Sequence, residues 1–341
     1  MRIIVDAMGG DNAPEEVVKG CLEALSINKT VEIELIGDRK KIEKCLKKRS
    51  YDASRLLITD AKEEITNNDT PTEAIKKKQN SSIVIGLKKM KDKEGDAFIS
   101  AGSTGALLAG SLLITGRMKG VVRPALAPVV PSEGGKNTMI IDAGMNTQIK
   151  PINYMQFGIM GTEYMKRMFG VESPRVGLVN VGTEENKGNN ALKQAYDLLK
   201  NSNLNFIGNV EGRDITEGKV DVVVCDGLTG NAMLKVMEGT GRFFMDYLKR
   251  IYSMSLASKI SFLMIRHELK KLKKQMDPEE VGGTPILGVN GIIYKCHGNS
   301  KAKAFKNTII KACSSACVTV LEQIRNIFSK MEVGGAYDEA L

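Results

Sequence analysis

The residues that could do chemistry in this chain are mostly lysines, asparagines, hydroxyls and glycines, because the common catalytic signatures are missing. The sequence has two histidines, His267 and His297, and they do not form a HExxH pair. It has no GxSxG elbow, and the segment around Lys136 lacks the upstream glycine and the hydroxyl of a P-loop. Cys313 and Cys317 have no second cysteine pair that would complete a zinc site, so no metal is expected.

This set of residues suits a reaction in which a substrate supplies the nucleophile. Inorganic phosphate is already anionic at neutral pH and needs no activating serine or cysteine. The protein would have to hold phosphate against an electrophile and stabilise the oxyanion that develops. Backbone amides at helix N-termini suit the first task, and lysine, asparagine or histidine donors suit the second.

The elements that must position these groups are short strands alternating with helices, a pattern that predicts a mostly parallel sheet covered by helices. The strand-like runs are RIIVD, VEIELIG, LLITD, DAFIS, TMIID, RVGLVN, LNFIG and VDVVVCD. In ILGVNGIIYK, Asn290 and Gly291 lie between apolar runs and predict a hairpin, which makes the sheet mixed. We expect a three-layer α/β/α, Rossmann-like fold and one catalytic domain over residues 1–341, with two lobes as the alternative.

Polar, glycine-rich segments follow most of these strands. They read DAMGGDNAP, SAGSTGAL, DAGMN, NVGTEENKG, GNVEGRD and CDGLTGNAMLK, and the late hairpin continues into CHGNSKAK. Ligands of such sheets bind beyond the carboxyl ends of the strands. One glycine turn would be weak evidence, but this many at equivalent places indicate a shared binding rim.

The net charge of +9 indicates an anionic partner. The chain has no tryptophan and its basic runs carry no interleaved aromatics, which argues against single-stranded nucleic acid. Six cysteines without CxxC spacing suit a reducing compartment, and no secretion signal opens the chain, so we expect a cytoplasmic protein. The uncharged stretch 97–116 contains four glycines and five hydroxyl residues, and predicts a buried strand, turn and helix rather than a membrane span.

A charged helical stretch near 244–280 interrupts the alternation. At helical spacing it divides into an apolar side (Ile265, Leu269, Leu272, Met276) and a basic side (Arg266, Lys270, Lys273). One interpretation is a helix that packs on its own protein or on a partner subunit. The other is an interfacial helix in contact with anionic lipid.

Taken together, the rim segments resemble the PlsX family of bacterial phosphate acyltransferases. The segments that carry the resemblance occur in the family's order between residue 5 and about residue 305: VDAMGGDNAPEEVVKG, SAGSTGALLA, RPALA, NVGTEENKG, GNVEGRDI, DVVVCDGLTGNAMLKVMEG and GGTPILGVNGIIYKCHGNS. The chain departs from the family pattern at Ser103, Asn299 and Leu228, where the family usually has asparagine, serine and phenylalanine. These exchanges leave the reaction class intact.

The resemblance implies an enzyme without a cofactor that moves a long-chain acyl group from acyl carrier protein to inorganic phosphate, for phosphatidic acid and phospholipid synthesis. It also implies a homodimer, peripheral contact with the cytoplasmic face of the membrane, and a fold similar to isocitrate and isopropylmalate dehydrogenases and to phosphotransacetylase. Lys187, Asn231 and His297 are the expected catalytic residues: Lys187 and His297 contact phosphate, and Asn231 polarises the thioester carbonyl. The expected substrate-binding residues are Asp6, Gly9, Gly10, Asp11, Asn12, Ser103, Thr104, Gly105, Gly298, Asn299 and Ser300.

Asp6 and Asp11 are unusual in a loop that would hold an anion. They either organise the loop through backbone hydrogen bonds, orient a basic group such as Lys187, or only cap turns. Ser103 and Thr104 could likewise be simple helix caps. The alternative functions are a phosphotransacetylase-like enzyme that uses acyl-coenzyme A and a non-catalytic module that binds lipid or carrier protein. A dehydrogenase lacks the expected GxGxxG signature.

Overall fold

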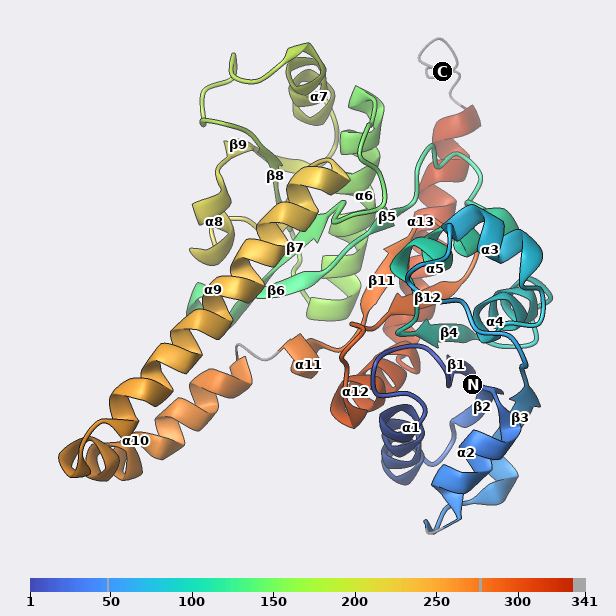
Figure 1. Ribbon diagram of the computed structural model, residues 1–341. Helices are drawn as coiled ribbons and strands as arrows, with labels where there is room; N and C mark the ends of the chain where they lie inside the picture. The colour runs from blue at the N-terminus through green and yellow to red at the C-terminus, as the bar shows by residue number, and fades with distance from the viewer. Residues whose placement is uncertain (48, 276–277, 334–341) are drawn as a thin grey trace.

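Two sheets make up the strand framework of the computed structural model, which describes residues 1–47, 49–275 and 278–333 (Figure 1). The seven-stranded sheet has the order β3 (Leu56–Asp60), β2 (Glu32–Gly37), β1 (Arg2–Asp6), β4 (Ala97–Ser100), β12 (Ile292–Lys295), β11 (Thr284–Leu287) and β5 (Ala125–Leu126). The strands from β3 to β12 are parallel to one another, whereas β11 is antiparallel to both of its neighbours.

The five-stranded sheet has the order β6 (Val129–Ser132), β7 (Lys136–Ile141), β10 (Val222–Val224), β8 (Arg175–Val179) and β9 (Asn205–Val210). Only β6 is antiparallel to its neighbour. The predicted mixed, mostly parallel α/β class is therefore confirmed, with the strands divided between two sheets.

Local sequence signals explain where many helices begin. Asp38, Ser81, Ser103, Asn189 and Asp226 each cap a helix by accepting a hydrogen bond from a backbone N–H of the first turn. The helices are α1 (Glu15–Ile27), α2 (Arg39–Leu46), α3 (Pro71–Lys77), α4 (Ser82–Lys91), α5 (Thr104–Gly110), α6 (Pro151–Phe169), α7 (Asn190–Lys200), α8 (Gly212–Thr216), α9 (Gly227–Ser253), α10 (Leu256–Gln275), α11 (Pro278–Val281), α12 (Ala302–Ala312) and α13 (Ser315–Val333). Short 3-10 turns cover Ala53–Arg55 and Glu133–Gly135, and one π-helical turn covers Ser111–Thr115.

Each sheet is covered by helices on both faces. In the seven-stranded sheet, α1, α2 and α12 pack on the face that carries Ile3 and Val5, and α3, α4 and α5 pack on the face that carries Ile4 and Phe98. In the five-stranded sheet, α6 and α7 cover one face and α8 and α9 the other. The alternation of side chains along a strand explains this division, because both faces of each central strand are apolar.

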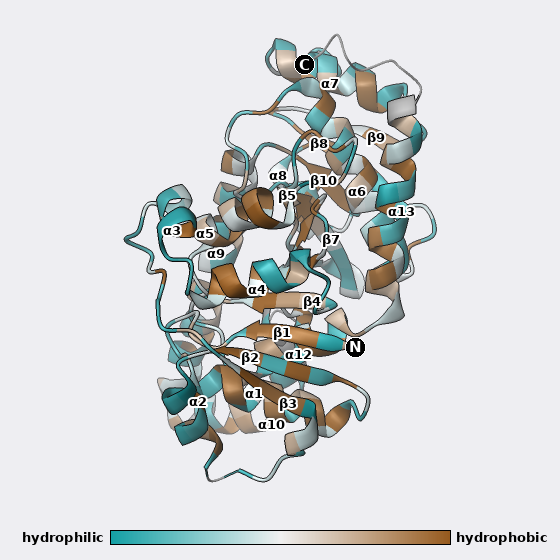
Figure 2. Ribbon diagram, turned by 90° about the vertical axis from the view of Figure 1, so that its right-hand side faces the viewer, coloured by the Kyte–Doolittle hydropathy of each residue, from teal (hydrophilic) through white to brown (hydrophobic). Residues whose placement is uncertain are grey.

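One hydrophobic cluster joins the two sheets. It combines Ala125 and Leu287 of the seven-stranded sheet with Met139 and Ile141 of the five-stranded sheet, and the helices α6 and α13 contribute most of its large side chains. Figure 2 shows hydrophobic residues along strands such as β1 and β4, and hydrophobic and hydrophilic residues alternating along the helices. The two sheets therefore share a core. The single-domain expectation itself stays a prediction.

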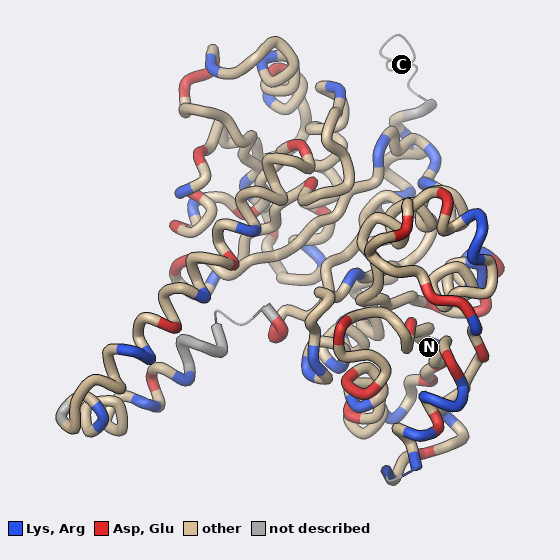
Figure 3. Tube along the Cα trace, in the orientation of Figure 1, with Lys and Arg blue, Asp and Glu red and all other residues tan. Residues whose placement is uncertain are grey.

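The helices α9 and α10 form an arm that projects from the body of the protein (Figure 1). We define the helical arm as residues 236–270. Large apolar side chains on it are exposed, including Phe243 at 71% and Met264 at 79%, and Figure 3 shows lysines, arginines and acidic residues spread along both helices. The expected helical excursion thus exists, and α9 already begins at Gly227. The side chains of Leu272 and Lys273, and all of Met276, lie outside the described residues.

The uncharged stretch 97–116 folds as predicted into β4, a turn and α5 with its π-helical extension. Among the described residues, no helix is both long and apolar enough to cross a bilayer.

Candidate active site

The loops after β1, β4 and β12 meet at the carboxyl edge of the seven-stranded sheet, and we call this edge the first rim. The Asp11 amide donates to the Gly298 carbonyl over 2.7 Å, and the Asn12 side-chain amide donates to the Asn299 carbonyl over 3.0 Å. A Cβ on Gly10 would lie 2.8 Å from the Gly298 oxygen, and φ of Gly10 is +100°. Only glycine allows these two loops to approach so closely.

Asp6 ends β1 and is fully buried beneath the first loop. One carboxylate oxygen accepts hydrogen bonds from the Met8 and Gly9 amides, both at 3.0 Å, and the other accepts from the Ser100 hydroxyl at 2.6 Å. The Asp6 side chain therefore holds the first loop from beneath. Asp11, by contrast, is exposed and takes part in the rim through its backbone amide.

His297, Asn299 and Ser300 form the turn that follows β12. The Ser300 amide donates to the His297 carbonyl over 3.0 Å, and the Asn299 amide approaches His297 Nδ1 at 3.4 Å. With Nδ1 accepting a hydrogen bond, the neutral ring carries its proton on Nε2. The ring is exposed, so this N–H is available to a ligand.

Ser103, Thr104 and Gly105 begin α5 on the same rim. The Ser103 hydroxyl accepts from the Ala106 amide at 3.5 Å, which makes Ser103 a helix cap whatever else it contacts. Thr104 is exposed, and Gly105 packs against Pro71 of α3.

Asn231 lies in the first turns of α9, beside the loop that follows β7. A Cβ on Gly144 would be 3.8 Å from the Asn231 Cβ. Asp142 holds this loop: its carboxylate accepts from the Leu126 amide at 2.9 Å and from the Asn146 amide at 2.6 Å. Burial raises the pKa of the Asp142 carboxyl.

Two contacts bring the Asn231 region toward the first rim. Met145, from the loop after β7, packs against the apolar cluster to which α5 contributes Ala106 and Leu107. The Leu126 to Asp142 hydrogen bond ties β5 of one sheet to the end of β7 in the other. The loop that lies beside Asn231 is thereby linked to α5, whose cap Ser103 belongs to the first rim.

Lys187 lies apart from these contacts, in the loop between β8 and α7. Its ammonium is 4.0 Å from Glu184 of the same loop, and its carbonyl accepts a hydrogen bond from the Asn180 side chain. About half of its side chain is exposed. The described contacts place Lys187 against neither His297 nor Asn231.

Sequence reasoning missed two buried polar residues of the first rim, Ser100 and Lys295. Both are the last residues of strands, β4 and β12, and they are 0% and 8% exposed. The signal for Lys295 was a single lysine that ends the apolar run GIIYK, directly before CHGNS. Desolvation lowers the pKa of its ammonium.

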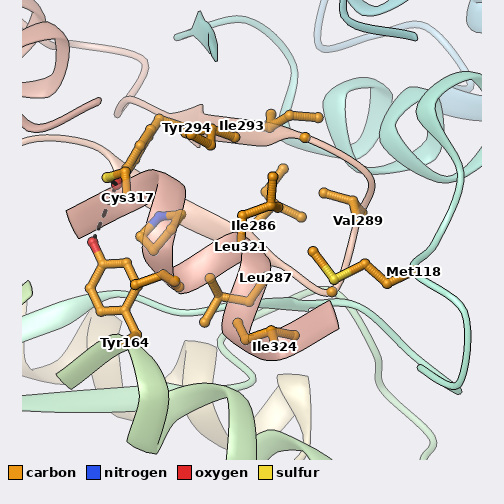
Figure 4. A pocket seen from close by; sticks show the side chains of 15 residues that line it. Met118, Tyr164, Ile286, Leu287, Val289, Ile293, Tyr294, Cys317, Leu321 and Ile324 are labelled. Carbon is orange, nitrogen blue, oxygen red and sulfur yellow. Dashed lines mark hydrogen bonds between the residues drawn. The ribbon is translucent and has the colours of Figure 1, made fainter. Parts of the chain in front are cut away.

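Among the described residues, no group of three or more His, Cys, Asp or Glu side chains could hold a metal ion. A cavity of about 30 Å³ lies between β11, β12, α6 and α13, away from the rim, and its lining is mostly apolar (Figure 4). The Tyr164 and Tyr294 hydroxyls lie 3.4 Å apart at its edge. This volume has room only for a very small group, so the cavity is not a binding site for a substrate of ordinary size.

Solved structures with a similar fold include a phosphotransacetylase from Streptococcus pyogenes, at a TM-score of 0.63 and 15% identity over 94% of each chain. Another is a branched-chain phosphotransacylase from Enterococcus faecalis, at a TM-score of 0.57 and 12% identity over 94% of this chain and 99% of that one. At this identity the likeness shows the fold alone, and it confirms the expected resemblance to the phosphotransacetylase fold.

Similarity to known sequences defines the class of this protein, which is a transferase of lipid biosynthesis. The chain belongs to the fatty acid synthesis protein family, whose model matches residues 1–323. It is 56% identical over 333 residues to a phosphate acyltransferase of Acetivibrio thermocellus, which covers 98% of both chains. It is 51% identical over 325 residues to a phosphate acyltransferase of Caldanaerobacter subterraneus, which covers 95% of this chain and 96% of the relative. The family predicted from the rim segments is confirmed.

Proposed function

We propose that this protein transfers a long-chain acyl group from acyl carrier protein to inorganic phosphate, and that the acyl phosphate serves phospholipid synthesis. The strongest support is sequence similarity. Over nearly its full length, the chain is 56% and 51% identical to two proteins named phosphate acyltransferase. The first rim adds chemical support, since its close-packed glycine loops and exposed histidine suit an oxyanion substrate. The glycine loops and the histidine would bind and orient phosphate, which is itself the nucleophile, so the protein need not supply one.

In the proposed reaction, a phosphate oxygen attacks the thioester carbonyl carbon, and the carbonyl oxygen becomes an oxyanion. The carbon–sulfur bond then breaks, the carbonyl re-forms, and the carrier leaves as a thiolate that takes a proton from solvent. Asn231 donates its side-chain N–H to the developing oxyanion, a contact that strengthens in the transition state. His297 donates its Nε2–H to phosphate, and Lys187, in the loop between β8 and α7, supplies a further positive charge.

The donor is proposed to be acyl carrier protein because the chain carries a net charge of +9 and acyl carrier proteins are strongly acidic. Complementary charge raises the association rate of such partners, and salt should weaken the effect. Acyl-coenzyme A is the competing donor.

A comparison of the two donors tests this assignment. Purified protein receives palmitoyl-acyl carrier protein or palmitoyl-coenzyme A at equal concentration with inorganic phosphate, and kcat/KM is measured at low and high salt. We expect at least tenfold preference for the carrier protein at low salt, reduced by salt. Preference for acyl-coenzyme A would assign the chain to phosphotransacetylase-like chemistry, and no turnover with either would leave a binding module.

We also propose that the chain forms a homodimer and contacts the cytoplasmic face of an anionic membrane peripherally. The helical arm supports both parts, because it exposes apolar side chains that the rest of the protein leaves uncovered. Examples on its two helices are Phe243, Tyr247, Leu263 and Met264. The basic residues Arg266 and Lys270 on α10 suit anionic headgroups.

A further inference from the structure

Asp6, Ser100 and Lys295 lie side by side at the carboxyl ends of three adjacent strands. In the sheet register, Ile4 pairs with Phe98 and Phe98 with Ile293, while Lys295 pairs with Ser100. Ile4, Phe98 and Ile293 belong to the same apolar cluster under α4 and α5. Since side chains two residues apart on a strand share a face, Asp6, Ser100 and Lys295 continue these three columns to the rim on that face.

Asp6, the acidic member of this row of three side chains, already has its hydrogen-bond donors. Asp6 accepts hydrogen bonds from two backbone amides and from the Ser100 hydroxyl. These bonds stabilise its negative charge and hold the first loop in place. A carboxylate fixed in this way does not need the lysine as a hydrogen-bonding partner.

The positive end of the row is a lysine that is costly to bury without a ligand. Lys295 is 8% exposed, and its ammonium donates to the Cys296 carbonyl of its own turn. An ammonium has three N–H donors and prefers anionic acceptors. Besides burial, which opposes its protonation, the groups that act on it electrostatically are Cys296, Asp6 and Asp11, which favour protonation, and Lys235 of α9, which opposes it.

The loops that follow β1, β4 and β12 pack tightly against one another at the strand ends. The glycines of the first and last rim loops, Gly10 and Gly298, touch backbone to backbone above the strand ends. A Cβ on Gly9 would lie 2.5 Å from the Gly102 amide, so the loop after β4 closes in equally tightly. The backbone amides of these loops and the Asp6 carboxylate therefore lie close together at the strand ends, where Lys295 ends β12.

We propose that the Lys295 ammonium is the buried cation that binds inorganic phosphate at the first rim. This assignment rests on the proposed phosphate acyltransferase function and gives its phosphate a specific partner. Asp6 and Ser100 act as positioning residues that hold the glycine loop around the bound anion. Lys295 would be a buried phosphate contact in addition to the contacts proposed for His297 and Lys187.

The test compares Lys295→Met and Lys295→Arg with Lys19→Met, which removes a lysine exposed on α1. Phosphate KM and kcat are measured at a saturating acyl donor, and the dissociation constant of inorganic phosphate is measured by calorimetry without donor. Lys295→Met should raise both phosphate constants about 10- to 100-fold and leave the KM of the acyl donor within twofold. Lys295→Arg should raise them less, and Lys19→Met should leave them unchanged.

A phosphate dissociation constant within twofold of wild type in folded Lys295→Met overturns the proposal. If that variant does not fold, titration of the wild-type protein decides. In protein labelled with ¹⁵N-lysine, saturating phosphate should shift the side-chain resonance that is missing from Lys295→Arg, and an unmoved resonance overturns it. Because calorimetry needs no donor, wild-type protein that binds phosphate through Lys295 yet makes no acyl phosphate would refute the proposed function and leave this site standing.

Discussion

The Ser100 hydroxyl donates to the Asp6 carboxylate across 2.6 Å, joining the ends of β4 and β1 beneath the first glycine loop. Both side chains are 0% exposed. A buried carboxylate with three donors organises backbone and does not itself meet an anion. The acidic character of DAMGGDNAP is thus compatible with a phosphate site, because the two aspartates occupy different environments.

Asp6→Asn and Asp11→Asn form a matched pair that tests this difference. In Asp6→Asn, one of the three donors meets an amide NH2 in place of a carboxylate oxygen. We expect a loss of about 1–3 kcal/mol in the free energy of unfolding and at least a tenfold fall in kcat/KM for phosphate. Asp11→Asn keeps its backbone contact and should change both by little. Urea unfolding and steady-state kinetics provide the measurements, and equal behaviour of the two variants would contradict the assignment.

Asn231→Ala should lower kcat about a hundredfold or more and leave the KM of the acyl donor nearly unchanged, since the proposed contact strengthens in the transition state. Gly144 packs beside this side chain, so truncation leaves space without disturbing the α9 cap at Asp226. Single-turnover rates separate chemistry from binding. A fall of less than threefold would remove Asn231 from the oxyanion site.

Lys187→Ala should raise the phosphate KM, if the loop after β8 closes over the bound anion. In the structure its side chain is half exposed and paired with Glu184. Glu184→Gln is the matched variant, because it releases the lysine from this pair and should leave the phosphate KM equal or lower. An unchanged phosphate KM in Lys187→Ala would identify Lys187 as a surface residue.

The buried ammonium of Lys311 should make the stability of the protein depend on pH. Its ammonium is buried over the Tyr294 ring without a hydrogen-bond partner among the described residues, and burial lowers its pKa to about 8. Below pH 8 the buried ammonium is charged in the folded protein, which lowers the free energy of unfolding. Between about pH 8 and the usual lysine value, the folded form alone is neutral, so the stability of the wild type rises with pH.

Lys311→Met should therefore be more stable than wild type at pH 7, by a free energy on the order of 2–3 kcal/mol. The advantage should shrink as pH rises from about 8 to 10. Urea unfolding across this range measures it, with Lys19→Met as the exposed control. A less stable Lys311→Met at pH 7 would mean that the cation–π contact outweighs the cost of burial.

The end of the helical arm should govern membrane contact. Met254 and Leu256 lie at the turn between α9 and α10 and are 71% and 79% exposed. The double replacement by Asp should weaken binding to anionic vesicles at least tenfold, because it removes apolar area and adds repulsion. Ile27→Asp, at the exposed end of α1, is the control. Cosedimentation with phosphatidylglycerol vesicles measures the effect, and equal binding by both variants would place the membrane surface elsewhere.

Much of the fold could be predicted from the sequence because the strands are short apolar runs with glycine at their ends. The hairpin at Asn290 and Gly291 and the cap at Ser103 are local signals, and both hold in the structure. The division into two sheets was not predictable, because pairing between strands about 195 residues apart, such as β4 and β12, has no local signal. β5 and β6 were missed because the prolines of RPALAPVVPS read as loop.

The site was predictable only in part, for the same physical reason. Glycine-rich loops indicate where two backbone segments approach closely, and the predicted meeting of the loops around Gly10 and Gly298 is seen in the structure, whereas their role in binding stays a prediction. Lys295 was missed because its burial depends on Ser100 and Asp6, which lie far away along the chain. Lys187 was expected at the rim from the resemblance, and its position depends on the separate loop after β8.

The most direct test of the central claim is phosphate-dependent formation of acyl phosphate. Purified protein is mixed with palmitoyl-acyl carrier protein and inorganic phosphate, the product is trapped with hydroxylamine, and the released carrier thiol is titrated in the same sample. The account predicts hydroxamate and free thiol in equal amounts, both absent without phosphate. Thiol release that does not depend on phosphate and yields no hydroxamate would mean hydrolysis, and would contradict acyl transfer to phosphate.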